Sequence, residues 1–82
     1  MIVDRKSMTI WIVEALEELE GYGTILEVSK KVWQKHGEEI TSSGDAFYTW
    51  QYELRWAGDI LRKQGVLKPA EESPRRVWKL SE

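Results

Sequence analysis

Two sets of side chains in the C-terminal half of the chain have the chemistry to bind a nucleic acid. Gln51 and Arg55 lie four residues apart, so on a helix they emerge side by side, and both can form bidentate hydrogen bonds with base edges. Arg75 and Arg76 are adjacent, and their planar guanidinium groups suit phosphates or the minor groove. The predicted DNA-contacting set is Ser42, Ser43, Tyr48, Thr49, Gln51, Tyr52, Arg55, Arg62, Arg75, Arg76 and Lys79.

The sequence has no comparable arrangement of residues that are suited to catalysis. His36 is the only histidine, and at the expected C-terminus of a helix it is interpreted as a cap that interacts with the helix dipole. Paired His or Cys at metal-binding spacing and phosphate-binding glycine loops are absent, and Gly21-Tyr22-Gly23 is interpreted as a turn. Glu38, Glu39 and Asp45 lie in or beside a loop and are interpreted as solvated carboxylates. We therefore expect no enzymatic activity, no metal and no cofactor.

The first of these sets requires a helix, which the spacing predicts from Thr49 to Gln64. Apolar residues recur at i, i+4, i+7 and i+11 and therefore share one face; they are Trp50, Leu54, Ala57 and Leu61. Gly65 suits a left-handed C-cap, so the helix should end at about Gln64. Arg62, farther along, is expected to point to the DNA backbone or to Asp59.

After this helix the period changes to that of strands. Residues 66–68 and 77–80 are short β-favouring runs, separated by residues 69–74, where two prolines exclude a helix and a central strand. Trp78 and Leu80 share one face of the second run, so they can close the core. We interpret the two runs as a hairpin wing that follows a recognition helix.

Two further helices are predicted upstream. The first is capped by Ser7 or Thr9 and ends before Gly21-Tyr22-Gly23. A short strand at 24–26 is expected to pair with the wing, and a second helix runs from Leu26 to about His36, where Gly37 ends it. Residues 41–45 form a loop before the third helix.

The element order is thus helix, strand, helix, helix, strand, strand. It predicts an α+β winged helix-turn-helix fold, in which residues 1–82 form one domain with three helices, a small antiparallel β-hairpin wing and a short third strand. A chain of this size buries one modest core. The expected core is Ile12, Leu16, Leu19, Val28, Val32, Trp50, Leu54, Ala57, Leu61, Leu67, Trp78 and Leu80.

Charge is unevenly distributed along the chain, whose formal net charge is −2. Residues 1–41 have five bases and eight acids (5 − 8 = −3), whereas residues 42–82 have seven bases and six acids (7 − 6 = +1). Domains that bind DNA through phosphates usually show a basic excess, so the total argues against DNA. The bases nevertheless fall on the third helix and the wing, where a winged helix meets double-stranded DNA.

The composition also limits which covalent and metal sites and which cellular location we expect. The absence of cysteine excludes disulfides and thiolate metal sites. The sequence has neither a signal-peptide h-region nor an apolar run long enough to cross a membrane. A cytoplasmic protein without membrane contact is therefore expected.

A family resemblance rests on residues 56–67 and 73–80. The first segment has a Trp-Ala pair at Trp56-Ala57, Leu61 one turn later and a strand start at Gly65-Val66-Leu67; the second ends in Arg75-Arg76-Val77-Trp78-Lys79-Leu80. In this order the motifs resemble the N-terminal winged-helix domain of Mrr-type restriction endonucleases. The resemblance covers roughly the C-terminal 30 residues and implies a DNA-recognition module that is commonly joined to a separate nuclease domain, which has no counterpart here. The family usually has glycine before Val-Trp, where this chain has Arg76.

A function of another class stays open. Trp11, Trp33, Trp56 or the tyrosines could form an apolar surface for a homodimer or a protein partner without DNA binding. Salt separates the two hypotheses, because binding to phosphates weakens steeply as salt rises and an apolar contact barely responds.

Overall fold

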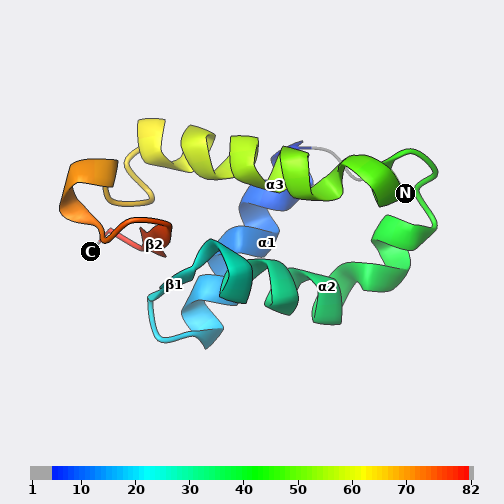
Figure 1. Ribbon diagram of the computed structural model, residues 1–82, viewed down its shortest axis with the longest axis horizontal. Coiled ribbons are helices and arrows are strands. Elements are labelled where there is room, and N and C mark those ends of the chain that lie inside the picture. Colours follow the sequence, from blue (N-terminus) through cyan, green and yellow to red (C-terminus); the bar gives the residue numbers. More distant parts are fainter. Residues whose placement is uncertain (1–4, 82) are drawn as a thin grey trace.

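Three helices and a two-stranded antiparallel sheet form an α+β fold in the computed structural model, which describes residues 5–81. The elements are α1 (Arg5–Glu18), β1 (Tyr22–Thr24), α2 (Ile25–Thr41), α3 (Ala46–Lys63), the 3-10 turn η1 (Ala70–Glu72) and β2 (Val77–Lys79). Helices α2 and α3 are joined by a turn at one end of the molecule, the sheet lies toward the other end, and α1 crosses behind both helices (Figure 1).

The core lies between the three helices and the sheet. Ten of the twelve predicted core residues are buried, and the other two, Leu19 and Leu80, are partly buried and pack against the core. The prediction of the core is therefore confirmed. Four buried residues were not in the predicted set: Met8, Trp11, Ala15 and Ile40.

Helix α1 begins earlier than its predicted caps. Ser7 and Thr9 lie inside the helix, and the Thr9 hydroxyl donates to the Lys6 carbonyl instead of capping. The C-terminal end is as predicted, because the chain leaves the helix through Glu20 and Gly21, both at positive φ (66° and 100°).

Strand β1 precedes the position predicted for it. It ends at Thr24, where a strand from 24 to 26 was expected, because Thr24 begins α2 with a capping box. The Thr24 hydroxyl accepts from the Glu27 N–H (3.0 Å), and the Glu27 carboxylate accepts from the Thr24 N–H (2.8 Å). The predicted pairing with the C-terminal strand is confirmed, with Gly23 opposite Trp78.

Helix α2 does not end at Gly37, as predicted, but continues to Thr41. The reason is tertiary packing: Ile40, one turn beyond Gly37, is fully buried in the core, and this burial outweighs the low helix propensity of glycine. The glycine also lies against the Trp33 ring, whose nearest atoms are 3.4 Å from where a Cβ would stand.

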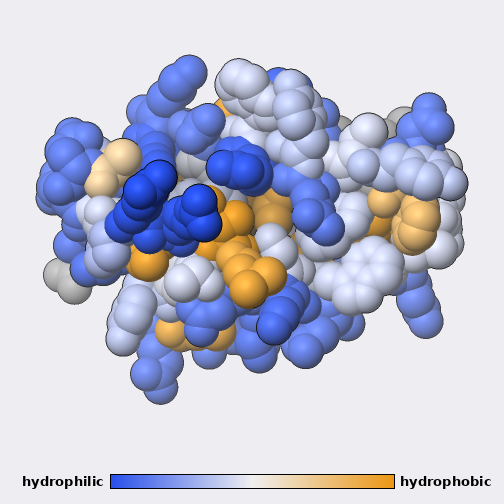
Figure 2. All heavy atoms as spheres, in the orientation of Figure 1, coloured by the Kyte–Doolittle hydropathy of each residue, from blue (hydrophilic) through white to orange (hydrophobic). Residues whose placement is uncertain are grey.

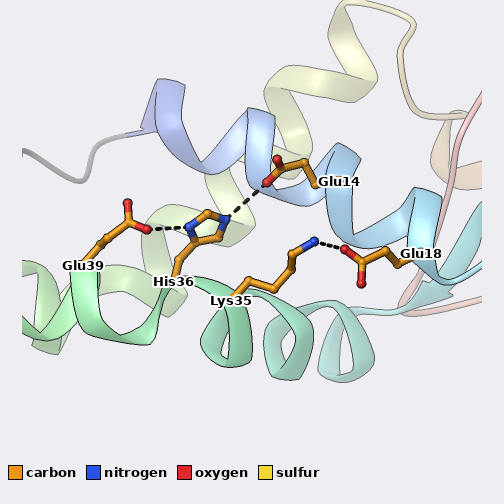
Figure 3. Close-up of polar contacts among 5 residues, drawn as sticks. All are labelled: Glu14, Glu18, Lys35, His36 and Glu39. Atoms are coloured by element: carbon orange, nitrogen blue, oxygen red, sulfur yellow. Dashed lines mark hydrogen bonds and ion pairs between the residues drawn. The ribbon is translucent and has the colours of Figure 1, made fainter.

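His36 is consequently inside α2 and not a C-terminal cap. Its ring stacks on Trp11 with centroids 3.9 Å apart, and its Nδ1 and Nε2 face Glu39 (2.8 Å) and Glu14 (3.2 Å). Figure 3 shows the ring between these carboxylates, one from α2 and one from α1. A neutral imidazole has one N–H, so it donates to both carboxylates only when it carries a second proton. The histidine therefore joins α1 to α2.

Helix α3 is close to the prediction and its C-terminus is confirmed. Gln64 is the C-cap and Gly65 adopts φ 79°. Gly58 faces the core, where the Trp78 indole packs so closely that a Cβ on Gly58 would lie 2.3 Å from Cζ2 of the ring. The absence of a side chain at Gly58 thus allows β2 to approach α3.

The predicted hairpin is only partly formed. Residues 66–68 are not a strand: a single bridge joins Leu67 to Leu80, supported by hydrogen bonds from the Lys68 N–H to the Lys79 carbonyl (2.9 Å) and from the Ser81 N–H to the Val66 carbonyl (2.8 Å). The run is limited on one side by the left-handed Gly65 and on the other by proline, which cannot donate to a ladder. We call residues 68–76 the 68–76 loop.

Candidate nucleic-acid interface

The solvent-facing side of α3 presents the polar residues that the sequence assigned to DNA contact. Tyr48, Gln51, Tyr52 and Arg55 are all exposed, and Tyr48 is 83% exposed. The rings of Tyr48 and Tyr52 rest edge-on against Phe47 and Trp56, at centroid distances of 5.1 and 6.2 Å. We call Tyr48, Gln51, Tyr52 and Arg55 the α3 polar strip.

Three other predicted residues lie at the N-terminal end of this strip. Ser42 is exposed and is the C-cap of α2, and the Ser43 hydroxyl donates to the Glu39 carbonyl (2.6 Å). The Thr49 hydroxyl donates within the helix to the Asp45 carbonyl (3.3 Å). The hydroxyls of Ser43 and Thr49 are thus used locally, and Ser42 presents its side chain to solvent.

Arg62 differs most from its prediction. Its Nη2 donates to the Val77 carbonyl (3.2 Å), and its Nε is buried without a hydrogen-bond partner among residues 5–81. The side chain therefore lies between α3 and β2, and the predicted contact with Asp59 is not formed. Arg62 therefore links β2 to α3.

Arg75 and Arg76 are exposed at the end of the 68–76 loop, directly before β2. Arg76 adopts φ 63°, a left-handed conformation that favours glycine, and its carbonyl accepts from the Ile25 N–H (2.9 Å). Lys79 is half-buried in β2, opposite Tyr22. The backbone at Arg76 is therefore held by a hydrogen bond to the start of α2.

These groups are spread along the molecule. The 18 residues of α3 span about 27 Å, and Ser42 and Ser43 precede the helix while the 68–76 loop follows it. The structure brings Gln51 and Arg55 together on one helix and leaves the serines and the loop arginines at opposite ends (Figure 1). A partner that touched all of them would have to be extended.

Most of the ion pairs lie where α1 contacts the other two helices. Within residues 5–81 all but one of them involve α1, where Arg5 pairs with Glu53 of α3, and Glu14 and Glu18 pair with α2; Figure 3 shows Lys35 reaching Glu18, and the remaining pair, His36 with Glu39, lies within α2. The hydrogen bond from Arg5 to Glu53 raises the pKa of the Arg5 guanidinium. Glu14 and Glu18 of the acidic first half are therefore engaged at the contact between α1 and α2.

The cations of the α3 surface and the 68–76 loop have no such partners in the described part of the chain. They are Arg55, Lys63, Lys68, Arg75 and Arg76, and the unpaired acids of the same region are Asp59, Glu71 and Glu72. Figure 2 shows the most hydrophilic atoms of this face gathered over the C-terminal half of α3 and the sheet end of the molecule. Cations and acids alternate along this region, and Arg75 and Arg76 lie at its loop end.

A groove between α2 and α3 was not predicted from the sequence. It has a volume of about 580 Å³, and its apolar lining is Leu26, Trp33, Phe47 and Trp50. Its signal in the sequence is the seven-residue spacing of Leu26 and Trp33, which places both on one side of α2. That spacing identifies an apolar face but not the neighbouring helix that completes a groove.

Comparisons with protein-family models, with curated proteins and with solved structures found no match to this chain. The Mrr resemblance consequently stays a prediction. Among residues 5–81, no helix has the length and apolar character needed to cross a membrane, and no group of three or more potential ligands is arranged to hold a metal ion.

Proposed function

We propose that this chain is a DNA-binding winged-helix module, in which α3 enters the major groove and the 68–76 loop is the wing. The observation that carries the proposal is that the α3 polar strip and the loop arginines are exposed, with no ion pair to Arg55, Arg75 or Arg76 within residues 5–81. Unpaired guanidinium groups beside a polar helix face are suited to phosphates and base edges.

The order of the elements supports the same proposal. Three helices, a strand between the first two, and a C-terminal strand that pairs with it are compatible with a winged-helix layout. The resemblance of residues 56–67 and 73–80 to the Mrr N-terminal domain points the same way. The role would be binding and not catalysis, in the cytoplasm, either in a small regulator or in the targeting domain of a restriction-like system.

The proposed mechanism divides the contacts into two kinds. Gln51 and Arg55 would address neighbouring base edges, with Tyr48 and Tyr52 beside them, while Arg75 and Arg76 would bind the backbone or the minor groove. Arg62 would act indirectly, because its hydrogen bond to the Val77 carbonyl holds β2 against α3. Its contribution would be to position the wing relative to the recognition helix.

The test is fluorescence anisotropy with a labelled random duplex over a range of salt concentrations. Replacing Arg75 and Arg76 with alanine should weaken binding about equally on all sequences and reduce the salt slope by about one to two units. The double variant Lys31→Ala/Lys35→Ala is the matched control, because it removes the same charge from the α1–α2 contact. An unchanged slope in the arginine variant would remove the 68–76 loop from the proposed interface.

Base reading has its own test. Replacing Arg55 with alanine should cost about 1–3 kcal/mol more on a preferred site than on random DNA, because a bidentate base contact is lost. An equal loss on both would make Arg55 a phosphate contact.

A second candidate, a protein-interaction module without DNA binding, is favoured by the large hydrophobic side chains on the surface. Ile10, Tyr48, Tyr52 and Trp56 are all exposed, although Trp11, which the sequence also suggested for this role, is buried in the core. The same salt series decides between the candidates: absence of binding to any duplex at low salt would favour the second.

A further inference from the structure

The groove between α2 and α3 is an apolar surface that shares only Gln51 with the proposed DNA contacts. In Figure 2 the apolar atoms exposed between these helices face the viewer, beside the hydrophilic region at the sheet end. Leu26 is 64% exposed, Phe47 44% and Trp33 41%. Apolar side chains this open and this close together are typical of a binding surface.

The walls of the groove are firmly held. Trp33 stacks on Trp50, which is buried, at a centroid distance of 5.6 Å. Leu26 is the second residue of α2, whose first turn is fixed by the capping box of Thr24 and Glu27. The apolar side chains are therefore presented by rigid helices, so a ligand would bind without having to order them.

The groove is cationic. Lys30 is the single charged residue that lines it, the other polar lining residues being amides and a serine. Lys30 makes no ion pair within residues 5–81, whereas the next residue, Lys31, faces Glu18. A ligand with negative charge beside an apolar face would complement this lining.

The dimensions favour a helix over a second copy of the chain. Leu26 and Trp33 are seven residues apart, about 10 Å along α2, which matches apolar residues at i, i+3 and i+7 of a docked helix. Taking about 200 Å² for each side chain, an upper figure for leucine, the exposed fractions of Leu26, Trp33 and Phe47 leave at most about 300 Å² open. A stable homodimer buries about 800 Å² per partner, so the groove is too small to hold two copies together.

We propose that this groove binds an amphipathic helix of a partner protein, with its apolar face on Leu26, Trp33 and Phe47 and acidic residues beside Lys30. The inference does not rest on DNA binding. Gln51 lines the groove and also belongs to the α3 polar strip, so a bound helix would compete with DNA at the N-terminal half of α3.

The experiment uses a labelled synthetic peptide of about four helical turns, with leucines at i, i+3 and i+7 and glutamates on both flanks, followed by anisotropy. The double variant Leu26→Ser/Phe47→Ser should weaken binding at least about tenfold, because two apolar contacts are lost. Ile10→Ser, an exposed apolar residue of α1 outside the groove, is the matched control and should bind as the unchanged protein does. Circular dichroism verifies that each variant is folded.

Charge reversal gives a readout that loss of structure cannot imitate. Lys30→Glu should weaken the acidic peptide about three- to tenfold and tighten a lysine-flanked version by a similar factor, whereas Lys6→Glu, the same change on α1, should alter neither. Equal binding of acidic and lysine-flanked peptides, or unchanged binding to the Leu26→Ser/Phe47→Ser variant, would overturn the proposal. So would self-association in sedimentation that this variant abolishes, since a second copy would then be the occupant. Arg75→Ala/Arg76→Ala should keep full peptide binding, so that a failure of the DNA proposal is distinguishable.

Discussion

Replacement of Gly58 with alanine should destabilise the fold, although alanine is the better helix former. The added Cβ would lie 2.3 Å from Cζ2 and 2.7 Å from Cε2 of Trp78, where carbon atoms normally approach to about 3.5–4.0 Å. The ring would have to move by more than about 1 Å, and Trp78 is 2% exposed and paired with Gly23 across the sheet. The strain therefore falls on the core and on the β1–β2 contact.

The magnitude follows from two opposing terms. Overpacking costs about 1–3 kcal/mol, and a contact this short with a rigid ring belongs at the upper end of that range. The gain in helix propensity is about 1 kcal/mol. The net loss in the free energy of unfolding is therefore about 2 kcal/mol, which lowers the thermal midpoint by about 8–16 °C in a domain of this size.

Thermal unfolding followed by circular dichroism measures this shift, and two further variants test its cause. Gly37→Ala in α2 is the matched control, because its Cβ would meet the Trp33 ring at 3.4 Å, which is ordinary van der Waals contact, so it should raise the midpoint by about 4–8 °C through about 1 kcal/mol of helix propensity. In a Trp78→Phe background, which lacks the clashing atoms, Gly58→Ala should cost much less. An unchanged or higher midpoint for Gly58→Ala, or the same loss in both backgrounds, would refute the reasoning.

The remaining predictions also concern the stability of the fold, and the same thermal unfolding experiment measures them. Leu54→Ala should lower the free energy of unfolding by about 2–5 kcal/mol, because Leu54 is fully buried, whereas Leu26→Ala should change it by less than about 0.5 kcal/mol; similar effects would contradict the assigned core. Arg76→Gly should stabilise by about 0.5–1 kcal/mol, because glycine relieves the strain of φ 63° at a smaller entropic cost, and Arg76→Ala should bring no such gain. Thr24→Ala should cost about 1 kcal/mol through loss of the capping box, and Thr24→Ser should retain the stability; an unaffected alanine variant would show that the cap is dispensable.

The sequence predicts the elements whose local signals agree with their packing. The apolar stripe through Leu54 and Leu61 and the glycine that ends α3 act within a few residues of each other, so spacing alone locates the helix and its C-terminus. Gly37 was misleading because its local signal opposes a tertiary one: burial of Ile40 three residues later keeps α2 helical. A single sequence contains no information about which of two such opposing terms is larger.

For the candidate site, too, the predictions that depend on local spacing agree with the structure, and those that depend on tertiary packing do not. Exposure of Gln51 and Arg55 follows from the helical period, and the structure agrees. Arg62 was expected to point to the DNA backbone or to Asp59, because a helical wheel does not include the strand that comes to lie beside it. The Val77 carbonyl that it reaches is 15 residues later. The α2–α3 groove escaped prediction for a similar reason, since it depends on the distance between two helices.

The pairing of Gly23 with Trp78 has a consequence for how the chain acquires its structure during synthesis. The two residues are 78 − 23 = 55 positions apart, and Trp78 also covers Gly58 of α3. Until β2 has been released from the ribosome, β1 lacks its partner and one side of α3 lacks its cover, so a growing chain holds three helices around an open core. Such a species exposes apolar surface and a strand edge, which are the features that favour aggregation, until β2 pairs with β1 and Trp78 packs on α3.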